Sequence, residues 1–425
     1  MGLREEIQLM GRQARRASRE LAVLPAERKN AILRAMADGL EAGAGRIEEA
    51  NREDLERGRE RGRERGLSEA MLDRLALDGG RIRAMAQGVR EVAELADPVG
   101  EVLAEWDRPN GLRITKVRVP IGVIGIIYES RPNVTSDAAA LCFKSGNATI
   151  LRGGSEAIAS NRVIAEVLQA AGASAGLPAH SIQLIGATDR ESVRYLAEMD
   201  ESLDLIIPRG GKGLIETVVS LARMPVIKHY DGICHVYVDA AADLGMAERI
   251  VCNAKCQKPG VCNAAETLLV HEAVAERFLA ALIPALRSAG VEVRGDERVR
   301  GICAEVVAAT EEDWATEYLA LILSVKVVAD VEEAMEHIAR YGSRHSDCIV
   351  TEDAVVAGRF LAGVDSAAVF WNASTRFNDG GEFGFGCEIG ISTDKLHARG
   401  PMGLPELTIY KYLVRGTGQV RNGVS

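Results

Sequence analysis

The sequence predicts an α/β protein with two α/β domains, mostly parallel sheets and a helical N-terminal region. Between Lys116 and His229, β-branched apolar segments alternate with segments of helical periodicity, and the alternation restarts after Asp239. Such alternation is typical of βαβ units with helices on both faces of a sheet. The 425 residues are enough for two or three domains.

Composition excludes several function classes. The chain has 51 basic and 61 acidic residues and a net charge of −10, so no global basic field favours nucleic acid. No apolar run reaches the roughly 18 residues of a membrane span, and the first residues lack the apolar core of a signal peptide. With eight cysteines and no such signal, we expect reduced thiols and a cytoplasmic protein.

The first 95 residues predict helices. Ile7, Met10, Ala14 and Leu21 recur at helical spacing, and a second helix opens at Pro25. The stretch 57–65 alternates arginine with glycine or glutamate, which indicates a solvated helix face or loop rather than a basic patch.

The first α/β region begins with an apolar run, 117–127, that predicts a buried strand and its turn. The further predicted strands are 148–151, 182–185, 204–207 and 225–229, and the predicted helices are about 155–171, 189–199 and 211–222. Ligands of such sheets bind beyond the carboxyl ends of the strands.

The ends of two of these strands have sequences suited to binding a phosphate group. Residues 151–155 (Leu-Arg-Gly-Gly-Ser) and 208–213 (Pro-Arg-Gly-Gly-Lys-Gly) each follow a strand and open a helix. Small residues let backbone N–H groups approach an anion at a helix N-terminus. Each alone is also compatible with an ordinary βα turn; two in one sheet favour a dinucleotide.

The second α/β region has predicted helices near 243–254, 272–289 and 331–341 and strands near 266–271 and 321–328. Residues 370–400 show little periodicity. Residues 406–414 predict a late strand that pairs with another element or subunit.

Cys262 is the candidate nucleophile. It follows the turn pair Pro259-Gly260 and precedes a predicted strand, a position from which a thiol can point into a cleft. The alternative is a small core residue. Cys256 is a rival thiol, although its spacing from Cys252 fits one face of a packed helix. That pair lacks a nearby second pair of ligands, so we expect no metal.

The chain resembles the aldehyde dehydrogenase superfamily, and within it the γ-glutamyl phosphate reductases (glutamate-5-semialdehyde dehydrogenases). The matching segments lie in order along almost the whole chain: 119–125, 128–135, 143–147, 150–155, 208–211, 228–232, the Cys262 stretch and 384–392.

This resemblance implies an aldehyde dehydrogenase-like fold with a Rossmann-type cofactor domain, a second α/β catalytic domain and a small β oligomerisation element. The implied boundaries are 1–106 and 126–238 for the NADP-binding domain, 239–370 for the catalytic domain, 107–125 and 400–425 for the oligomerisation strands, and 371–399 for a return to the cofactor domain and the active-site cleft. A homodimer or homotetramer is implied too.

The implied reaction is reduction of L-glutamyl 5-phosphate by NADPH through a thioacyl intermediate on Cys262, a step of proline biosynthesis. Asn133 matches the asparagine of the oxyanion hole, whose amide could lower the barrier by roughly 3 kcal/mol. The implied cofactor-binding residues are Arg152, Gly153, Ser155, Arg209, Gly210, Gly211 and, by a looser match, Glu317.

His229 stands where hydrolytic relatives have a water-activating glutamate, a departure that favours a reductase; a structural role is the alternative. Arg131, Lys144 and His229 are expected near the substrate, with the region of Arg376 and Lys395 as a further source of positive charge. The thiolate needs nearby positive charge, for which Lys255, Lys258 and His229 are candidates.

Two other functions stay open: a CoA-acylating or other semialdehyde dehydrogenase, and a non-catalytic binding protein. A transient contact with glutamate 5-kinase, which would make the acyl phosphate, is also left open.

Overall fold

The computed structural model describes residues 2–65 and 69–421 and divides the chain into two compact units. Unit 1 comprises residues 1–228, 385–390 and 402–425, and unit 2 comprises residues 229–384 and 391–401. Among the described helices, none is long and apolar enough to cross a membrane.

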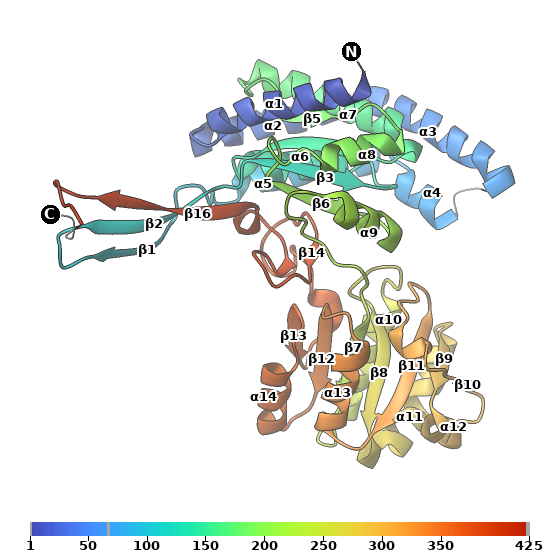
Figure 1. Cartoon of the computed structure of the whole chain (residues 1–425). Coiled ribbons are helices and arrows are strands. Elements are labelled where there is room, and N and C mark those ends of the chain that lie inside the picture. The colour runs from blue at the N-terminus through green and yellow to red at the C-terminus, as the bar shows by residue number, and fades with distance from the viewer. Residues whose placement is uncertain (1, 66–68, 422–425) are drawn as a thin grey trace. The chain divides into compact units, whose positions relative to one another are not determined.

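Unit 1 begins with the expected helices, which carry apolar residues at helical spacing on their buried faces. They are α1 (Leu3–Leu21), α2 (Ala26–Ala42), α3 (Ala44–Arg65), α4 (Glu69–Leu75) and α5 (Gly79–Glu94). The alternating-charge stretch 57–65 lies in α3, as a helix rather than a loop. Figure 1 shows these helices, coloured blue, beside the parallel sheet of the same unit.

That sheet has four parallel strands in the order β5-β4-β3-β6. Its elements are β3 (Val123–Tyr128), α6 (Val134–Lys144), β4 (Ala148–Gly153), α7 (Ile158–Ser174), β5 (Ile182–Leu184), α8 (Arg190–Ala197), β6 (Leu205–Arg209) and α9 (Lys212–Leu221). Strands β3 and β4 are buried along their whole length, as helices on both faces require.

The predicted strand 225–229 is wrong. Only a single bridge forms, between Val226 and Ile206. Pro225 has no N–H to extend the ladder, and the chain leaves unit 1 after Lys228.

A separate three-stranded antiparallel sheet of unit 1 has the order β1-β2-β16. Its strands are β1 (Val102–Asp107), β2 (Arg113–Pro120) and β16 (Thr408–Arg415). The predicted late strand is therefore confirmed, and it pairs with β2 over its full length. Figure 1 shows the red β16 beside the cyan β2.

Unit 2 is a seven-stranded parallel sheet in the order β10-β9-β11-β8-β7-β12-β13. Its strands are β7 (Cys234–Val238), β8 (Ala265–His271), β9 (Glu292–Gly295), β10 (Val307–Ala308), β11 (Ile322–Val328), β12 (Ser346–Val350) and β13 (Ala368–Trp371). Its helices are α10 (Leu244–Cys256), α11 (Glu272–Ser288), α12 (Glu297–Ile302), α13 (Val331–Tyr341) and α14 (Ala354–Gly363). A short pair, β14 (Ile391–Ser392) and β15 (Gly400–Pro401), completes the unit.

Two expected boundaries differ from this division. The boundary at residue 238 placed β7 with the first domain, but β7 pairs with β8 and β12 inside the sheet of unit 2. Of the segment 371–399, only residues 385–390 belong to unit 1.

Candidate active site

Cys262 lies in the turn between α10 and β8 and is partly exposed. Asn263, the next residue, anchors this turn. Its side-chain amide donates to the carbonyls of Asn378 (3.0 Å) and Arg376 (3.4 Å), and its own carbonyl accepts from the Thr375 hydroxyl (2.7 Å). The turn is therefore held by hydrogen bonds of Asn263, while Cys262 stays partly exposed.

Gly232 packs directly against the backbone of Cys262. A Cβ atom built on Gly232 would lie 2.0 Å from the Cys262 carbonyl oxygen and 2.5 Å from its Cα. No side chain fits there, so glycine is required by close approach rather than by its φ angle. The Gly232 N–H donates to the Glu317 carboxylate at 2.8 Å, which fixes the segment against Cys262.

Two histidines of unit 2 lie beside the thiol. The donor atoms of His229, Cys262 and His345 all lie within 4.8 Å of one another. The two rings meet edge to face, with centroids 5.4 Å apart. The Nδ1 of His229 donates to the Ile391 carbonyl at 2.8 Å, because a carbonyl can only accept.

His345 is fully buried, and its Nδ1 lies 2.8 Å from the Ser346 hydroxyl. Burial, and then the charge of His229, place the pKa of His345 well below its ordinary value, so the imidazole is neutral. Its Nε2 has no hydrogen-bond partner. His345 was missed in the sequence because nothing in its neighbourhood, Ser343-Arg344-His345-Ser346, signals a site.

The other thiols of this region are less suited to attack. Cys234 is fully buried, and burial raises the pKa of its thiol well above the ordinary value; its sulfur donates to the Cys262 carbonyl at 3.1 Å. Burial also raises the pKa of Cys256. A thiol that resists ionisation is a poor nucleophile, which favours Cys262.

The expected sources of positive charge are largely engaged elsewhere. Lys255 is buried and forms an ion pair with Glu266 at 2.6 Å. The Nε of Arg376 donates to Gln257 (2.8 Å), and Lys395 pairs with Asp365 (2.6 Å).

The candidate cofactor residues of unit 1 gather at one edge of its sheet. Tyr128, the last residue of β3, pairs with Gly153 of β4 and Arg209 of β6. The loops that carry Asn133, Ser155 and Gly211 therefore leave the same carboxyl edge, where parallel sheets bind ligands.

The N-terminus of α9 fits a phosphate. Gly210 and Gly211 are exposed there, and the Gly211 N–H already donates to a carboxylate oxygen of Glu129 at 3.0 Å. That oxygen shows that an anionic acceptor can reach this amide. The half-buried Arg209 lies close to Gly390, since a Cβ on Gly390 would come within 2.2 Å of its guanidinium.

The loop after β4 is more crowded. The Glu156 carboxylate accepts from the backbone N–H of Ser130 and from its hydroxyl. Arg152 is only 8% exposed, and its guanidinium donates to the Thr188 carbonyl (3.0 Å) and the Ser192 hydroxyl (3.3 Å). Arg152 therefore ties β4 to the start of α8 instead of pointing into solvent.

Asn133 is positioned by a carboxyl group. Its amide donates to Asp137 at 2.9 Å, one turn along α6. Burial raises the pKa of Asp137 to about 6, although hydrogen bonds from Asn133 and Ser136 and the charge of Arg209 act in the opposite direction. Asp137 is a second residue that the sequence did not reveal.

Two expected substrate residues differ in their surroundings. Arg131 is exposed beside Asn133. Lys144 is fully buried, and its ammonium donates to Asn30 and to the Ala93 carbonyl. The expectation that Lys144 binds substrate is therefore not supported, because its charge is used to join α6 to α2 and α5.

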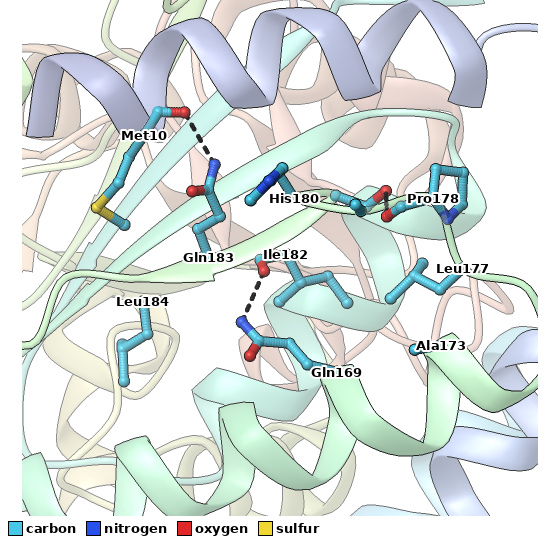
Figure 2. A pocket seen from close by; sticks show the side chains of 11 residues that line it. Met10, Gln169, Ala173, Leu177, Pro178, His180, Ile182, Gln183 and Leu184 are labelled. Atoms are coloured by element: carbon cyan, nitrogen blue, oxygen red, sulfur yellow. Dashed lines mark hydrogen bonds between the residues drawn. The ribbon is translucent and has the colours of Figure 1, made fainter. Parts of the chain in front are cut away.

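A separate pocket of about 320 Å³ in unit 1 does not resemble a catalytic site. Figure 2 shows it between α1, α7 and β5; the amides of Gln183 and Gln169 donate to the carbonyls of Met10 and Ile182, each at 2.9 Å. His180 is its one titratable lining residue, and no thiol lines it.

Comparison with known proteins agrees with this architecture. Residues 2–303 match the model of the aldehyde dehydrogenase family. The γ-glutamyl phosphate reductase of Moorella thermoacetica is 58% identical over 99% of this chain and 100% of its own length, and that of Caldanaerobacter subterraneus subsp. tengcongensis is 56% identical over 98% and 100%.

Solved structures give the same result. The crystal structure of γ-glutamyl phosphate reductase from Thermotoga maritima superposes with a TM-score of 0.95 at 49% identity, covering 98% of this chain and 100% of that one. An acetylating aldehyde dehydrogenase from Geobacillus thermoglucosidasius, 19% identical, covers 99% of this chain and 98% of its own and shares the fold with a TM-score of 0.70. The chain belongs to the aldehyde dehydrogenase family.

Proposed function

We propose that this protein reduces L-glutamyl 5-phosphate to L-glutamate 5-semialdehyde and phosphate with NADPH, a step of proline biosynthesis. The name shared by relatives that are 53–58% identical over their full length supports this substrate. The observation that carries the chemistry is the partly exposed Cys262, held on an anchored turn with the imidazoles of two histidines within 4.8 Å of its sulfur.

In this proposal the Cys262 thiolate attacks the acyl carbon, and the bond to phosphate breaks to leave a thioester on the enzyme. The amide of Asn133 stabilises the oxyanion that forms during attack. The reduced nicotinamide supplies the hydride that converts the thioester, and the thiolate leaves as the aldehyde forms.

His229 replaces the glutamate that would activate water in hydrolytic relatives. Its Nδ1 proton is committed to the Ile391 carbonyl. We propose that this histidine orients the thiol and does not promote hydrolysis of the thioester. We propose that the exposed Arg131 binds the phosphate or α-carboxylate of the substrate.

Within unit 1, we propose that Gly210, Gly211 and Arg209 at the N-terminus of α9 bind the phosphates of NADP(H), with Gly153 and Ser155 beside them. The shared carboxyl edge of β3, β4 and β6 supports this. Arg152 acts as a positioning residue. Glu317, whose carboxylate also accepts from the Gly232 N–H, is proposed to meet the nicotinamide ribose.

We also propose that the β1-β2-β16 sheet is the oligomerisation element of a homodimer or homotetramer, in a cytoplasmic enzyme. Trp106 and Tyr412 contact edge to face at 6.2 Å, and Tyr410 and Val414 lie on the same face by strand alternation. These side chains are 38–57% exposed, an apolar surface suited to a second copy.

The first prediction concerns the thiol. Cys262→Ala should abolish oxidation of the semialdehyde in the reverse direction, followed as formation of reduced nicotinamide, whereas Cys256→Ala should keep most of the rate. Loss of activity in Cys256→Ala alone would assign the nucleophile to Cys256.

The same assay tests the substrate. The reverse rate should require inorganic phosphate and be higher with NADP than with NAD. A rate that depends on CoA instead of phosphate would identify a CoA-acylating enzyme, and no rate with either acceptor would contradict the proposed function.

A further inference from the structure

The group formed by His229, Cys262 and His345 has the composition of a transition-metal site. One thiol and two imidazoles come from three separate segments of unit 2: the entry to β7, the turn before β8 and the entry to β12. Their donor atoms lie within 4.8 Å of one another. Among the described residues, no other group of three or more His, Cys, Asp or Glu side chains meets this distance.

The surroundings of both imidazoles resemble those of metal ligands. A ligating histidine usually engages its second ring nitrogen in a hydrogen bond that sets the ring orientation. Here the Nδ1 of His229 donates to the Ile391 carbonyl, and the Nδ1 of His345 lies 2.8 Å from the Ser346 hydroxyl. In His345 this leaves Nε2 as the nitrogen suited to a metal.

His345 supplies an independent sign of a ligand. It is 0% exposed, yet its Nε2 has no hydrogen-bond partner. A buried polar atom without a partner is costly, and most such atoms in native proteins are satisfied. A metal ion beside Cys262 would satisfy this one.

We propose that Cys262, His229 and His345 bind one Zn²⁺ ion reversibly, with a fourth position open to water. Tetrahedral zinc with bonds of about 2.0–2.3 Å places its ligand atoms roughly 3.3–3.7 Å apart. The distances between the three ligand atoms, now up to 4.8 Å, must therefore shorten by about 1 Å when zinc binds. Rotation of the side chains can supply this change.

Zinc binding deprotonates the thiol and occupies its sulfur lone pair. The metal therefore protects Cys262 from alkylation and oxidation. If Cys262 is the nucleophile, as the proposed function has it, zinc is also a reversible inhibitor that a chelator removes. The zinc site itself does not depend on the reaction catalysed.

The test uses the full-length reduced protein and measures binding without turnover. Zn²⁺ is titrated against a chromophoric chelator, and Co²⁺ serves as a spectroscopic probe of thiolate ligation. We expect one zinc per chain, a thiolate-to-cobalt charge-transfer band, and slowed alkylation of Cys262 by iodoacetamide when zinc is present.

Cys262→Ala should abolish the zinc site, and His229→Gln and His345→Gln should each weaken it by at least about tenfold. Cys303→Ala, which removes a partly exposed thiol elsewhere in unit 2, is the matched control and should bind zinc as the wild type does. Because His345 is buried, circular dichroism must show that the His345→Gln variant is folded. If that variant is unfolded, His229→Gln, at a partly exposed position, tests the histidine ligands instead.

Zinc binding that survives Cys262→Ala, or that is lost there but unchanged in the folded histidine variants, would overturn the proposed site. Absence of zinc binding in the wild type would do so as well. The phosphate-dependent assay of semialdehyde oxidation is scored separately in metal-free buffer, so failure of the zinc site and failure of the proposed reaction are distinguishable.

Discussion

At the scale of single residues, the position of Cys262, the proposed nucleophile, depends on a neighbour that has no side chain. The Cys262 backbone occupies the space where any residue other than glycine at position 232 would place its Cβ. In the sequence, the pair Asp231-Gly232 is typical of an ordinary turn. Its steric role is visible only when both segments are seen together.

Gly232→Ala should therefore displace the Cys262 turn and reduce the reverse rate at least tenfold. The added Cβ would lie 2.0 Å from the backbone oxygen of Cys262, so rotation of a flexible side chain cannot relieve the clash. Steady-state kinetics and the rate of iodoacetamide labelling of Cys262 measure the effect.

Gly301→Ala is the matched control. Gly301 lies in α12 of the same unit, and an added Cβ meets nothing within 4 Å. Alanine is favoured over glycine in a helix by roughly 0.5–1 kcal/mol, so this variant should keep its activity and be slightly more stable. Equal activity of both variants would contradict the steric role of Gly232.

Asp137 gives a pH prediction. Its folded-state pKa of about 6 lies above the ordinary value of 3.8, so the folded protein binds this proton more tightly than the unfolded chain. The group therefore lowers stability progressively as pH rises from about 4 to 6, by an amount of order 3 kcal/mol at most. Asp137→Asn removes this cost while keeping an oxygen that accepts from Asn133.

The melting temperature of Asp137→Asn, relative to the wild type, should consequently be higher at pH 7.5 than at pH 4.5. Asp200→Asn, at an exposed turn, should show no such change with pH. A difference between Asp137→Asn and wild type that is constant with pH would contradict the raised pKa.

Residue type and local turns predicted some of the candidate site and could not predict the rest. Cys262 was identified because the turn chemistry lies next to it in the sequence. His345 lies 83 positions later, and only the parallel pairing of β7 with β12 brings its segment beside Cys234. Lys144 was chosen by charge alone, but burial commits it to unit 1.

At the scale of elements, α10 is joined to β8 by a buried ion pair. Lys255 and Glu266 are both 0% exposed, and the other Glu266 oxygen accepts from the Leu319 N–H at 3.3 Å. Burial raises the pKa of Glu266 to about 7 against the attraction of Lys255, and burial lowers the pKa of Lys255. The pair positions the two elements that flank the Cys262 turn.

Removal of one member of the Lys255–Glu266 ion pair should destabilise unit 2 far more than removal of both. Glu266→Gln or Lys255→Met leaves a buried group uncompensated and should destabilise unit 2 by about 3–5 kcal/mol, whereas the double variant Lys255→Met/Glu266→Leu should lose much less. Chemical denaturation of the three variants and the wild type gives the coupling energy. Additive losses would show that the two groups do not act as a pair.

The alternating pattern predicted all four strands of the parallel sheet of unit 1 but only β8 and β11 among the seven strands of unit 2. It detects strands that are buried on both faces and helices that are amphipathic. It could not predict the order of the strands. In the seven-stranded sheet β7 lies between β8 and β12, an arrangement set by crossover connections rather than by local sequence.

At the scale of the whole molecule, the proposed association involves the exposed aromatic face of the three-stranded sheet. Tyr410 also lies beneath the ammonium of Lys116, at 3.6 Å from its ring centroid. An isolated sheet of three strands with an exposed aromatic face gains stability when another copy covers that face.

Tyr410→Asp/Tyr412→Asp should therefore lower the mass measured by size-exclusion chromatography with light scattering to that of a single chain. The control is Val355→Asp in α14, a similarly exposed apolar residue (74%) of unit 2, which should leave the mass unchanged. A double variant that keeps the wild-type mass would place the interface elsewhere or exclude an oligomer.

The pairing of β16 with β2 has a consequence for biosynthesis. Residues 113–120 are translated before unit 2, but their partner strand, 408–415, is translated after it. Residues 229–384, which make up most of unit 2, are complete before that strand exists. We therefore expect most of unit 2, including the Cys262 turn, to fold on the nascent chain before the three-stranded sheet of unit 1 receives β16.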